Sequence, residues 1–263
     1  MIKQMKTMLA LLMLLAPAMT FSQGNPVEYM DQFTSQYGVI QTDMWDYTRS
    51  VSHGRSARKV EKRRMELIET SDAALSKAKR AKDYNGDSDF KEAVVEYFEI
   101  INLVLKEDYE KIVDMEEIAE QSYDLMEAYM MAREAASEKQ KEAAEMVGLA
   151  QKKFAEAHDI ELIESEDDVD SKMEIAGAVY KHYNEIFLIF FKSNKQEMYL
   201  LDAIGTSDLS AIEQNREALK STVAEGLEKL QDVTAYEGDR SMIDATKALF
   251  KFYEKRQRRR NWL

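Results

Sequence analysis

The stretch 108–159 constrains the fold more than any other part of the chain. It contains no proline and a single glycine, Gly148. Its apolar residues recur at intervals of three and four, which places them on one face of a helix: Ile112, Met115, Ala119, Tyr123, Met126, Tyr129, Met130, Ala136, Ala143, Val147, Ala150 and Phe154. A continuous helix of this length would be on the order of 75 Å long. We therefore expect one long helix with the rest of the chain on either side of it.

The middle of this helix, residues 133–142, is rich in charged side chains and offers only alanines as apolar contacts. Such a stretch is either a solvated bridge between two bundles or a place where the helix bends. In both cases it marks the boundary between two halves of the chain.

The two flanking parts resemble each other at a constant offset. Tyr84-Asn85-Gly86-Asp87 matches Tyr236-Glu237-Gly238-Asp239, and further matches without a gap pair Arg64, Leu67, Leu75, Lys77, Ala93 and Phe98 with Arg216, Leu219, Leu227, Lys229, Ala245 and Phe250. In each corner the glycine is expected to take a left-handed conformation after one helix, and the aspartate to cap the next. The pattern predicts an internal repeat.

The composition favours helix throughout. The chain has 263 residues, only two prolines and nine glycines, and no stretch with the period of two that strands show. We predict an all-α, elongated up-and-down bundle of about seven helices, with coiled-coil-like periodicity, at 26–51, 55–83, 87–105, 108–159, 169–201, 207–235 and 239 to the C-terminus. The expected divisions are a signal peptide (1–22), an N-terminal half (23–107), the long connecting helix (108–160) and a C-terminal half (161–263).

The N-terminus has the pattern of a secretory signal peptide. Lys3 and Lys6 precede an apolar run, and small residues follow it, so we expect cleavage near Ser22, or after Ala18 as the alternative. The chain has no cysteine and therefore no disulfide. No later apolar run is long enough for a membrane span. We expect an exported protein, located in the periplasm or at the cell surface.

The net charge argues against nucleic acid as a partner. It is −13 for the whole sequence, and removal of Lys3 and Lys6 with the signal peptide makes it −15. An acidic surface of this kind repels nucleic acid on average.

The residues of common catalytic and metal sites do not occur in the required patterns. The three histidines, His53, His158 and His182, lack the repeated Glu-x-x-His pairs of a di-iron bundle and the matched spacing of a zinc site. The acidic run 161–170 lacks the glycine and the final glutamate of a calcium loop, so a solvated loop with a helix cap is the favoured interpretation. We expect no catalytic residues, no metal and no cofactor.

Two groups of residues are candidates for binding a ligand or partner. Tyr183, Phe187 and Phe190 belong to an aromatic patch that would hold an apolar small molecule or peptide if a cavity lay beside it. Arg258, Arg259, Arg260 and Trp262 form a basic end that either complements a helix dipole or binds an anionic surface. A third expectation is that the acidic run 161–170 lies near the six cations at the start of the second helix (residues 55–64).

The middle of the chain carries a resemblance to a known group of proteins. The residues are Glu107-Asp108-Tyr109-Glu110-Lys111-Ile112-Val113-Asp114-Met115-Glu116-Glu117 and Ser122-Tyr123-Asp124-Leu125-Met126-Glu127-Ala128-Tyr129. With the signal peptide and the absence of cysteine, this resembles an uncharacterised family of exported or surface-associated all-helical proteins of Gram-negative bacteria. The resemblance implies location and fold and no activity.

The sequence therefore predicts a non-catalytic, exported helical-bundle protein that acts by binding or structural association at the cell envelope. A carrier of an apolar small molecule or peptide is the alternative. The expected partner is an envelope protein or an anionic surface, and the oligomeric state stays open.

Overall fold

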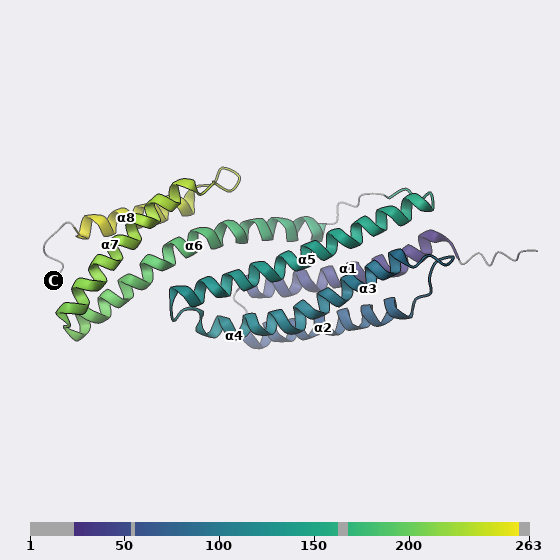
Figure 1. The fold of residues 1–263 in the computed structure, drawn as a ribbon, viewed down its shortest axis with the longest axis horizontal. Coiled ribbons are helices and arrows are strands. Elements are labelled where there is room, and N and C mark those ends of the chain that lie inside the picture. Colours follow the sequence, from purple (N-terminus) through teal and green to yellow (C-terminus); the bar gives the residue numbers. More distant parts are fainter. Residues whose placement is uncertain (1–23, 54–55, 163–167, 258–263) are drawn as a thin grey trace, which may run out of the picture.

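The computed structural model describes residues 24–53, 56–162 and 168–257, and within these ranges it contains helices and no strand (Figure 1). The helices are α1 (Pro26–Ser52), α2 (Ala57–Arg80), α3 (Asp89–Leu103), α4 (Tyr109–Ala119), α5 (Tyr123–Ala157), α6 (Asp168–Thr206), α7 (Leu209–Asp232) and α8 (Ser241–Gln257). A π-helical turn, η1 (Val104–Asp108), joins α3 to α4 without a gap, so the described chain has seven helical rods. The all-α helical bundle is confirmed, and each rod packs against the next along the chain.

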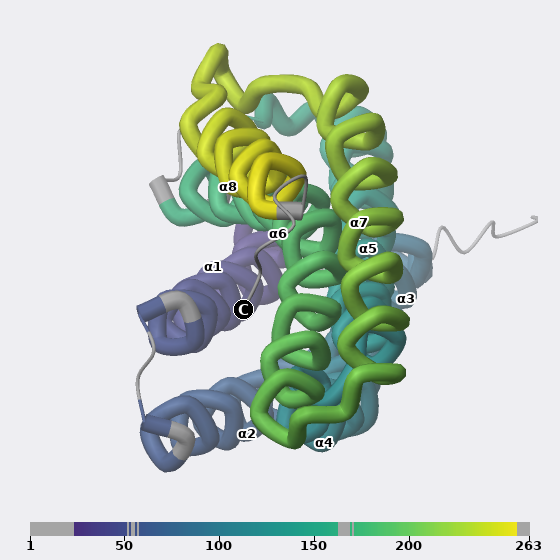
Figure 2. Tube along the Cα trace, turned by 90° about the vertical axis from the view of Figure 1, so that its left-hand side faces the viewer, coloured from purple at the N-terminus to yellow at the C-terminus, as the bar shows by residue number. Residues whose placement is uncertain are grey.

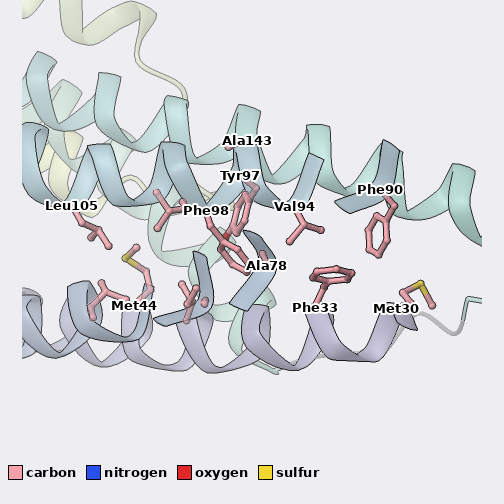
Figure 3. Close-up of a cluster of buried hydrophobic side chains, with 14 of the residues drawn as sticks. Met30, Phe33, Met44, Ala78, Phe90, Val94, Tyr97, Phe98, Leu105 and Ala143 are labelled. Atoms are coloured by element: carbon pink, nitrogen blue, oxygen red, sulfur yellow. The ribbon is translucent and has the colours of Figure 1, made fainter. Parts of the chain in front are cut away.

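The first bundle consists of α1, α2, α3 and the C-terminal half of α5. Their apolar faces meet in one core, in which Phe33, Leu67 and Phe98 are buried (Figure 3). From α5, Ala143 and Phe154 join this core, and the ring of Phe154 stacks on that of Phe90 with centroids 5.2 Å apart. Four amphipathic helices thus bury their apolar stripes against one another.

The predicted continuous helix over 108–159 is wrong. The chain breaks after Ala119, and α5 starts at Tyr123 and returns alongside α4 and α3. The physical reason is an N-cap, since the Ser122 hydroxyl accepts a hydrogen bond from the backbone N–H of Leu125 at 3.2 Å. The apolar spacing continues across this break, so periodicity alone did not show it.

Residues 133–142 are also not a solvated bridge. They lie inside α5, where Ala136 and Ala143 are buried and face the neighbouring helices. The small side chains allow α5 to pack closely while the charged residues cover its outer side. α5 is therefore a member of the first bundle, and the predicted connecting helix 108–160 does not exist as such.

The connection between the two parts of the molecule is α6. Its N-terminal half packs against α5 and α1, and its C-terminal half packs against α7 and α8 (Figures 1 and 2). The side chains of Ile186, Leu219 and Phe250 form the centre of a separate core there, and all three are fully buried. We call α7, α8 and the C-terminal half of α6 the C-terminal arm.

The break after α4 is fixed by α6. Lys195, a buried residue, donates a hydrogen bond from Nζ to the backbone oxygen of Glu120 at 3.0 Å, and its Nζ lies 5.2 Å from the ring centroid of Tyr199. A cation at a helix C-terminus complements the helix dipole. This contact joins α6 to the end of α4.

The two predicted corners adopt the same turn. Gly86 and Gly238 have φ values of 87° and 84°, and the residues before them, Asn85 and Glu237, also have positive φ. The carboxylate of Asp87 accepts a hydrogen bond from the N–H of Asp89 at 2.9 Å, and Asp239 accepts one from the N–H of Ser241 at 2.7 Å. The predicted glycine conformation is confirmed at both corners. Each aspartate accepts from the first N–H of the next helix, but it lies two residues before that helix begins, and the N-cap residue of α3 is Ser88.

The expectation that the acidic run lies by the start of α2 is wrong for its first two residues, 161 and 162. Next to them, the ring of His158 lies 4.8 Å from that of Tyr84, at the far end of α2 from its basic start, and α2 is about 35 Å long. The cations instead find acids on nearby helix turns: Lys62 with Glu66 at 3.3 Å and Arg64 with Glu61 at 2.9 Å. Residues 163–167 lie outside the described residues.

Candidate functional site

The aromatic patch on α6 is part of a packed core. Phe187 lies between Tyr183 and Phe191, with ring centroids 5.5 Å away on both sides, and Phe190 lies 6.0 Å from it. Phe187 and Phe190 pack against the cluster that α4 and α5 form with Phe191. Tyr183 is at the edge of this row and is 42% exposed. The structure thus brings the three predicted residues together, and two of them serve the contact between α6 and α5.

A cation lies next to this row, at the junction of α5 and α6. The Arg133 guanidinium carbon lies 5.6 Å from the ring centroids of both Tyr129 and Tyr180, and its Nη1 donates to the Tyr129 hydroxyl oxygen at 3.3 Å. Burial raises the pKa of Tyr129, and the nearby guanidinium partly offsets this. Cation–π contacts of this kind hold helices together, which gives Arg133 a structural role.

A hollow of about 340 Å³ lies between the start of α5, α6 and α7. At its wall the Glu225 carboxylate accepts hydrogen bonds from Lys192 at 2.8 Å and from Lys229 at 2.9 Å, and these hold the pKa of Glu225 below its usual value. The Lys192 Nζ also lies 5.4 Å from the ring centroid of Tyr123, whose pKa is raised to about 12, first by burial and then by Glu127. Lys192, Glu225 and Lys229 are thus paired with each other, and the Lys192–Glu225 pair joins α6 to α7.

No pattern in the sequence indicates this hollow. Its residues come from three helices, and only their packing brings them together. The Tyr183, Phe187 and Phe190 side chains do not line it. The lining contains lysines, acids, a threonine and a tyrosine, and no serine or histidine that would form a nucleophile–base pair.

The three histidines lie apart from one another. The ring of His158 packs against Tyr84 and Phe154, and that of His182 lies 6.1 Å from the ring of Tyr236. The Nδ1 of His53 is hydrogen-bonded to the backbone oxygen of Arg49 at 2.8 Å. Within the part of the chain that the structure describes, no three acidic or histidine side chains gather as metal ligands would.

The outer face of α8 exposes an aromatic ring together with cations. Phe252 is 49% exposed, and the guanidinium carbon of Arg256 lies 5.3 Å from its ring centroid. Lys251 and Lys255 are exposed beside it. The predicted basic residues Arg258, Arg259, Arg260 and Trp262 follow this helix and lie outside the described residues, as does the predicted signal peptide.

Charge is unevenly distributed along the chain. Residues 241–263 contain seven lysines and arginines and two acids, a formal charge of +5, so the remainder of the −13 chain carries −18. The aromatic ring of Phe252 thus lies in a basic segment of an otherwise acidic protein.

A comparison with protein-family models, curated proteins and solved structures found no match. Among the described residues, none of the helices has the combination of length and apolar composition that crossing a bilayer needs.

Proposed function

We propose that this chain is a non-catalytic, exported helical protein that acts by binding at the cell envelope, through the outer face of α8. The signal-peptide pattern of residues 1–22 supports export. The absence of a cysteine fits a protein that is held together by packing alone. Binding, rather than catalysis, is favoured because Lys192, Lys229 and Glu225 at the α6–α7 hollow are engaged in ion pairs with each other.

The observation that carries the binding role is the exposed Phe252–Arg256 pair on α8. Aromatic residues, phenylalanine among them, and arginine are enriched at protein–protein interfaces. Here they lie together on the outer helix of an arm that extends beyond the first bundle (Figure 1). The carrier function is not supported by a comparable observation, since Phe187 and Phe190 pack against α5.

Cell fractionation with charge reversal tests this proposal. Mass spectrometry of the protein from its native host should find a mature N-terminus near Gln23 and envelope association. The variant K251E/K255E/R256E should release most of the protein from the envelope fraction, because it inverts the charge around Phe252. The matched variant R58E/K59E/K62E makes the same charge change on α2 and should leave the association intact.

Two results would contradict the proposal. Cytosolic protein that retains Met1 would exclude export. Equal release of both variants would show that association with the envelope depends on the total charge of the protein and not on the α8 face.

A further inference from the structure

The two helical hairpins of the molecule have the same construction. The α2 helix spans Ala57–Arg80 and α7 spans Leu209–Asp232, so both ends differ by 152 positions, as do the first residues of α3 and α8. At this offset the buried Leu67 corresponds to Leu219, and the buried Phe98 corresponds to Phe250. The first hairpin therefore shows what covers each face of such a unit.

In the first hairpin, α5 covers the outer face of α3. The face includes the buried Phe90 and Tyr97 and the half-buried Ile100, and it continues into η1 with the buried Val104. Ala143 of α5 packs in the same core as Phe90 and Tyr97 (Figure 3), as does Phe154. Val104 clusters with residues of the N-terminal half of α5. The corner is covered as well, since the rings of Phe154 and Tyr84 lie 5.4 Å apart.

In the second hairpin, this face of α8 has no covering helix among the described residues. The residues that match Phe90, Tyr97, Ile100 and Val104 are Met242, Leu249, Phe252 and Arg256. Met242 and Leu249 are half-buried against the core of the arm, and Phe252 and Arg256 are exposed. The corner shows the same difference, because Tyr84 is 5% exposed whereas its counterpart Tyr236 is only half-buried. Figure 2 shows α8 at the outer side of the arm, beside α6 and α7.

We propose that this face of α8 binds an acidic amphipathic helix of another protein, in the place that α5 takes on α3. This inference rests on the proposed binding function and names the chemistry of the partner. The apolar stripe Met242–Ala245–Leu249–Phe252 has the spacing that meets one face of a helix. A helix that lies there would also cover Tyr236, as α5 covers Tyr84.

The charges around the stripe select an acidic partner. Lys251, Lys255 and Arg256 flank Phe252 and are exposed. At the last position of the face, Arg256 replaces the buried Val104 of η1, so the partner must bring a carboxylate there rather than an apolar group. Pairing of two α8 faces from two copies would oppose like charges, which disfavours that assembly.

Photo-crosslinking in the native host tests the inference on the full-length protein. A benzoyl-phenylalanine introduced at position 252 should crosslink to a peptide that has apolar residues at helical spacing and flanking Asp or Glu. The same probe at position 149 is the control, because Leu149 on α5 is 61% exposed and lies on the first bundle. A crosslink at 252 and none at 149 is the expected result.

A charge variant adds a second readout. In the protein with the probe at 252, K251E/K255E should lower the crosslink yield by about tenfold, because like charges then face the acidic helix. Thermal melts of each protein check that it remains folded, which is expected since these positions are exposed.

Several results would overturn the inference. A crosslink from position 252 to lipid, to a second copy of this chain or to a segment without an acidic amphipathic stripe would each do so. The absence of any crosslink from position 252 would do so as well. Envelope association that persists with any of these outcomes would leave the proposed function standing and would reject only the helix as its partner.

Discussion

The two corner glycines are the residues whose role the sequence predicts most directly. Gly86 and Gly238 have positive φ, and an added Cβ would meet no atom within 4 Å at either position. The cost of a substitution therefore comes from the backbone conformation alone. A β-branched residue in the left-handed region costs on the order of 1–2 kcal/mol.

We expect Gly86→Val and Gly238→Val each to lower the free energy of unfolding by that amount in denaturant titrations. Gly86→Asn is the control, since asparagine tolerates the left-handed conformation, and it should cost clearly less. Equal losses for valine and asparagine would show that the side chain, and not φ, is the cause.

Two half-buried tyrosines, Tyr29 and Tyr123, predict how stability depends on alkaline pH. Burial raises the pKa of Tyr29 and Tyr123 from 10.0 to about 12, and nearby carboxylates add to the shift. Each tyrosine has a higher pKa in the folded state than in the unfolded state, so its contribution to stability is fully present at pH values below the unfolded-state pKa. This contribution is lost as the pH rises towards the folded-state pKa. The free energy of unfolding should therefore fall between about pH 10 and about pH 12.

Absorbance titration of tyrosinate, followed together with circular dichroism, checks this expectation. In the native protein these tyrosines should ionise at a higher pH than free tyrosine. Removing one of them with Tyr123→Phe should make the pH dependence less steep. An unchanged slope would mean that Tyr123 does not contribute.

Local sequence predicts the backbone geometry at the two corners, but it does not predict the break before α5. A glycine and an aspartate in a short motif specify their own backbone geometry, so local sequence suffices. Ser122 is one of many serines in helical stretches, and its capping role appears only once Lys195 of α6 holds the carbonyl of Glu120. That contact joins residues 75 positions apart, and helical periodicity carries no information about it.

At the scale of elements, the two hairpins differ in how closely their helices approach. An added Cβ at Gly226 on α7 would lie 2.4 Å from Cε2 of Phe250, which is fully buried. The matching position on α2 is Ala74, so the first hairpin accommodates a methyl group where the second does not. Gly226 is needed for the close packing of α7 against α8.

We therefore expect Gly226→Ala to destabilise the protein. Overpacking a core costs about 1–3 kcal/mol, and the better helix propensity of alanine offsets up to about 1 kcal/mol of it. Gly148→Ala inside α5 meets no atom within 4 Å and should be neutral or stabilising. The comparison of the two unfolding midpoints separates packing from propensity, and a stabilising Gly226→Ala would mean that Phe250 moves aside.

The sequence predicts where most of the helices lie along the chain, but not which helices pack against one another. The apolar stripes of α3 and α8 are both visible in the sequence, because periodicity shows which residues share a face. Whether another helix covers that face depends on where the chain turns back. For α3, the turn before α5, which periodicity does not show, brings α5 back over this face. For the same reason the aromatic row of α6 was predicted as a possible ligand site, whereas Phe187 and Phe190 meet α5.

For the whole molecule, the decisive feature is that two separate cores are joined along α6. The first core includes Phe98, and the core of the C-terminal arm includes Phe250, and both side chains are at most 1% exposed. A third cluster, with Phe191, connects α6 to α4 and α5. Two such cores can open separately, since local unfolding follows cooperative units.

Hydrogen exchange on matched variants tests this independence. Phe98→Ala and Phe250→Ala remove equivalent rings, and each should cost about 3–5 kcal/mol within its own core. For Phe250→Ala, we expect amide protection to fall in α7, α8 and the C-terminal half of α6, while α1, α2 and α3 keep theirs. The arm has fewer helices around its core than the first bundle, so it should be the unit that opens at the lower free energy. If both variants lowered protection equally along the whole chain, the molecule would unfold as a single unit, and Lys195 together with the Phe191 cluster would then couple the arm to the first bundle.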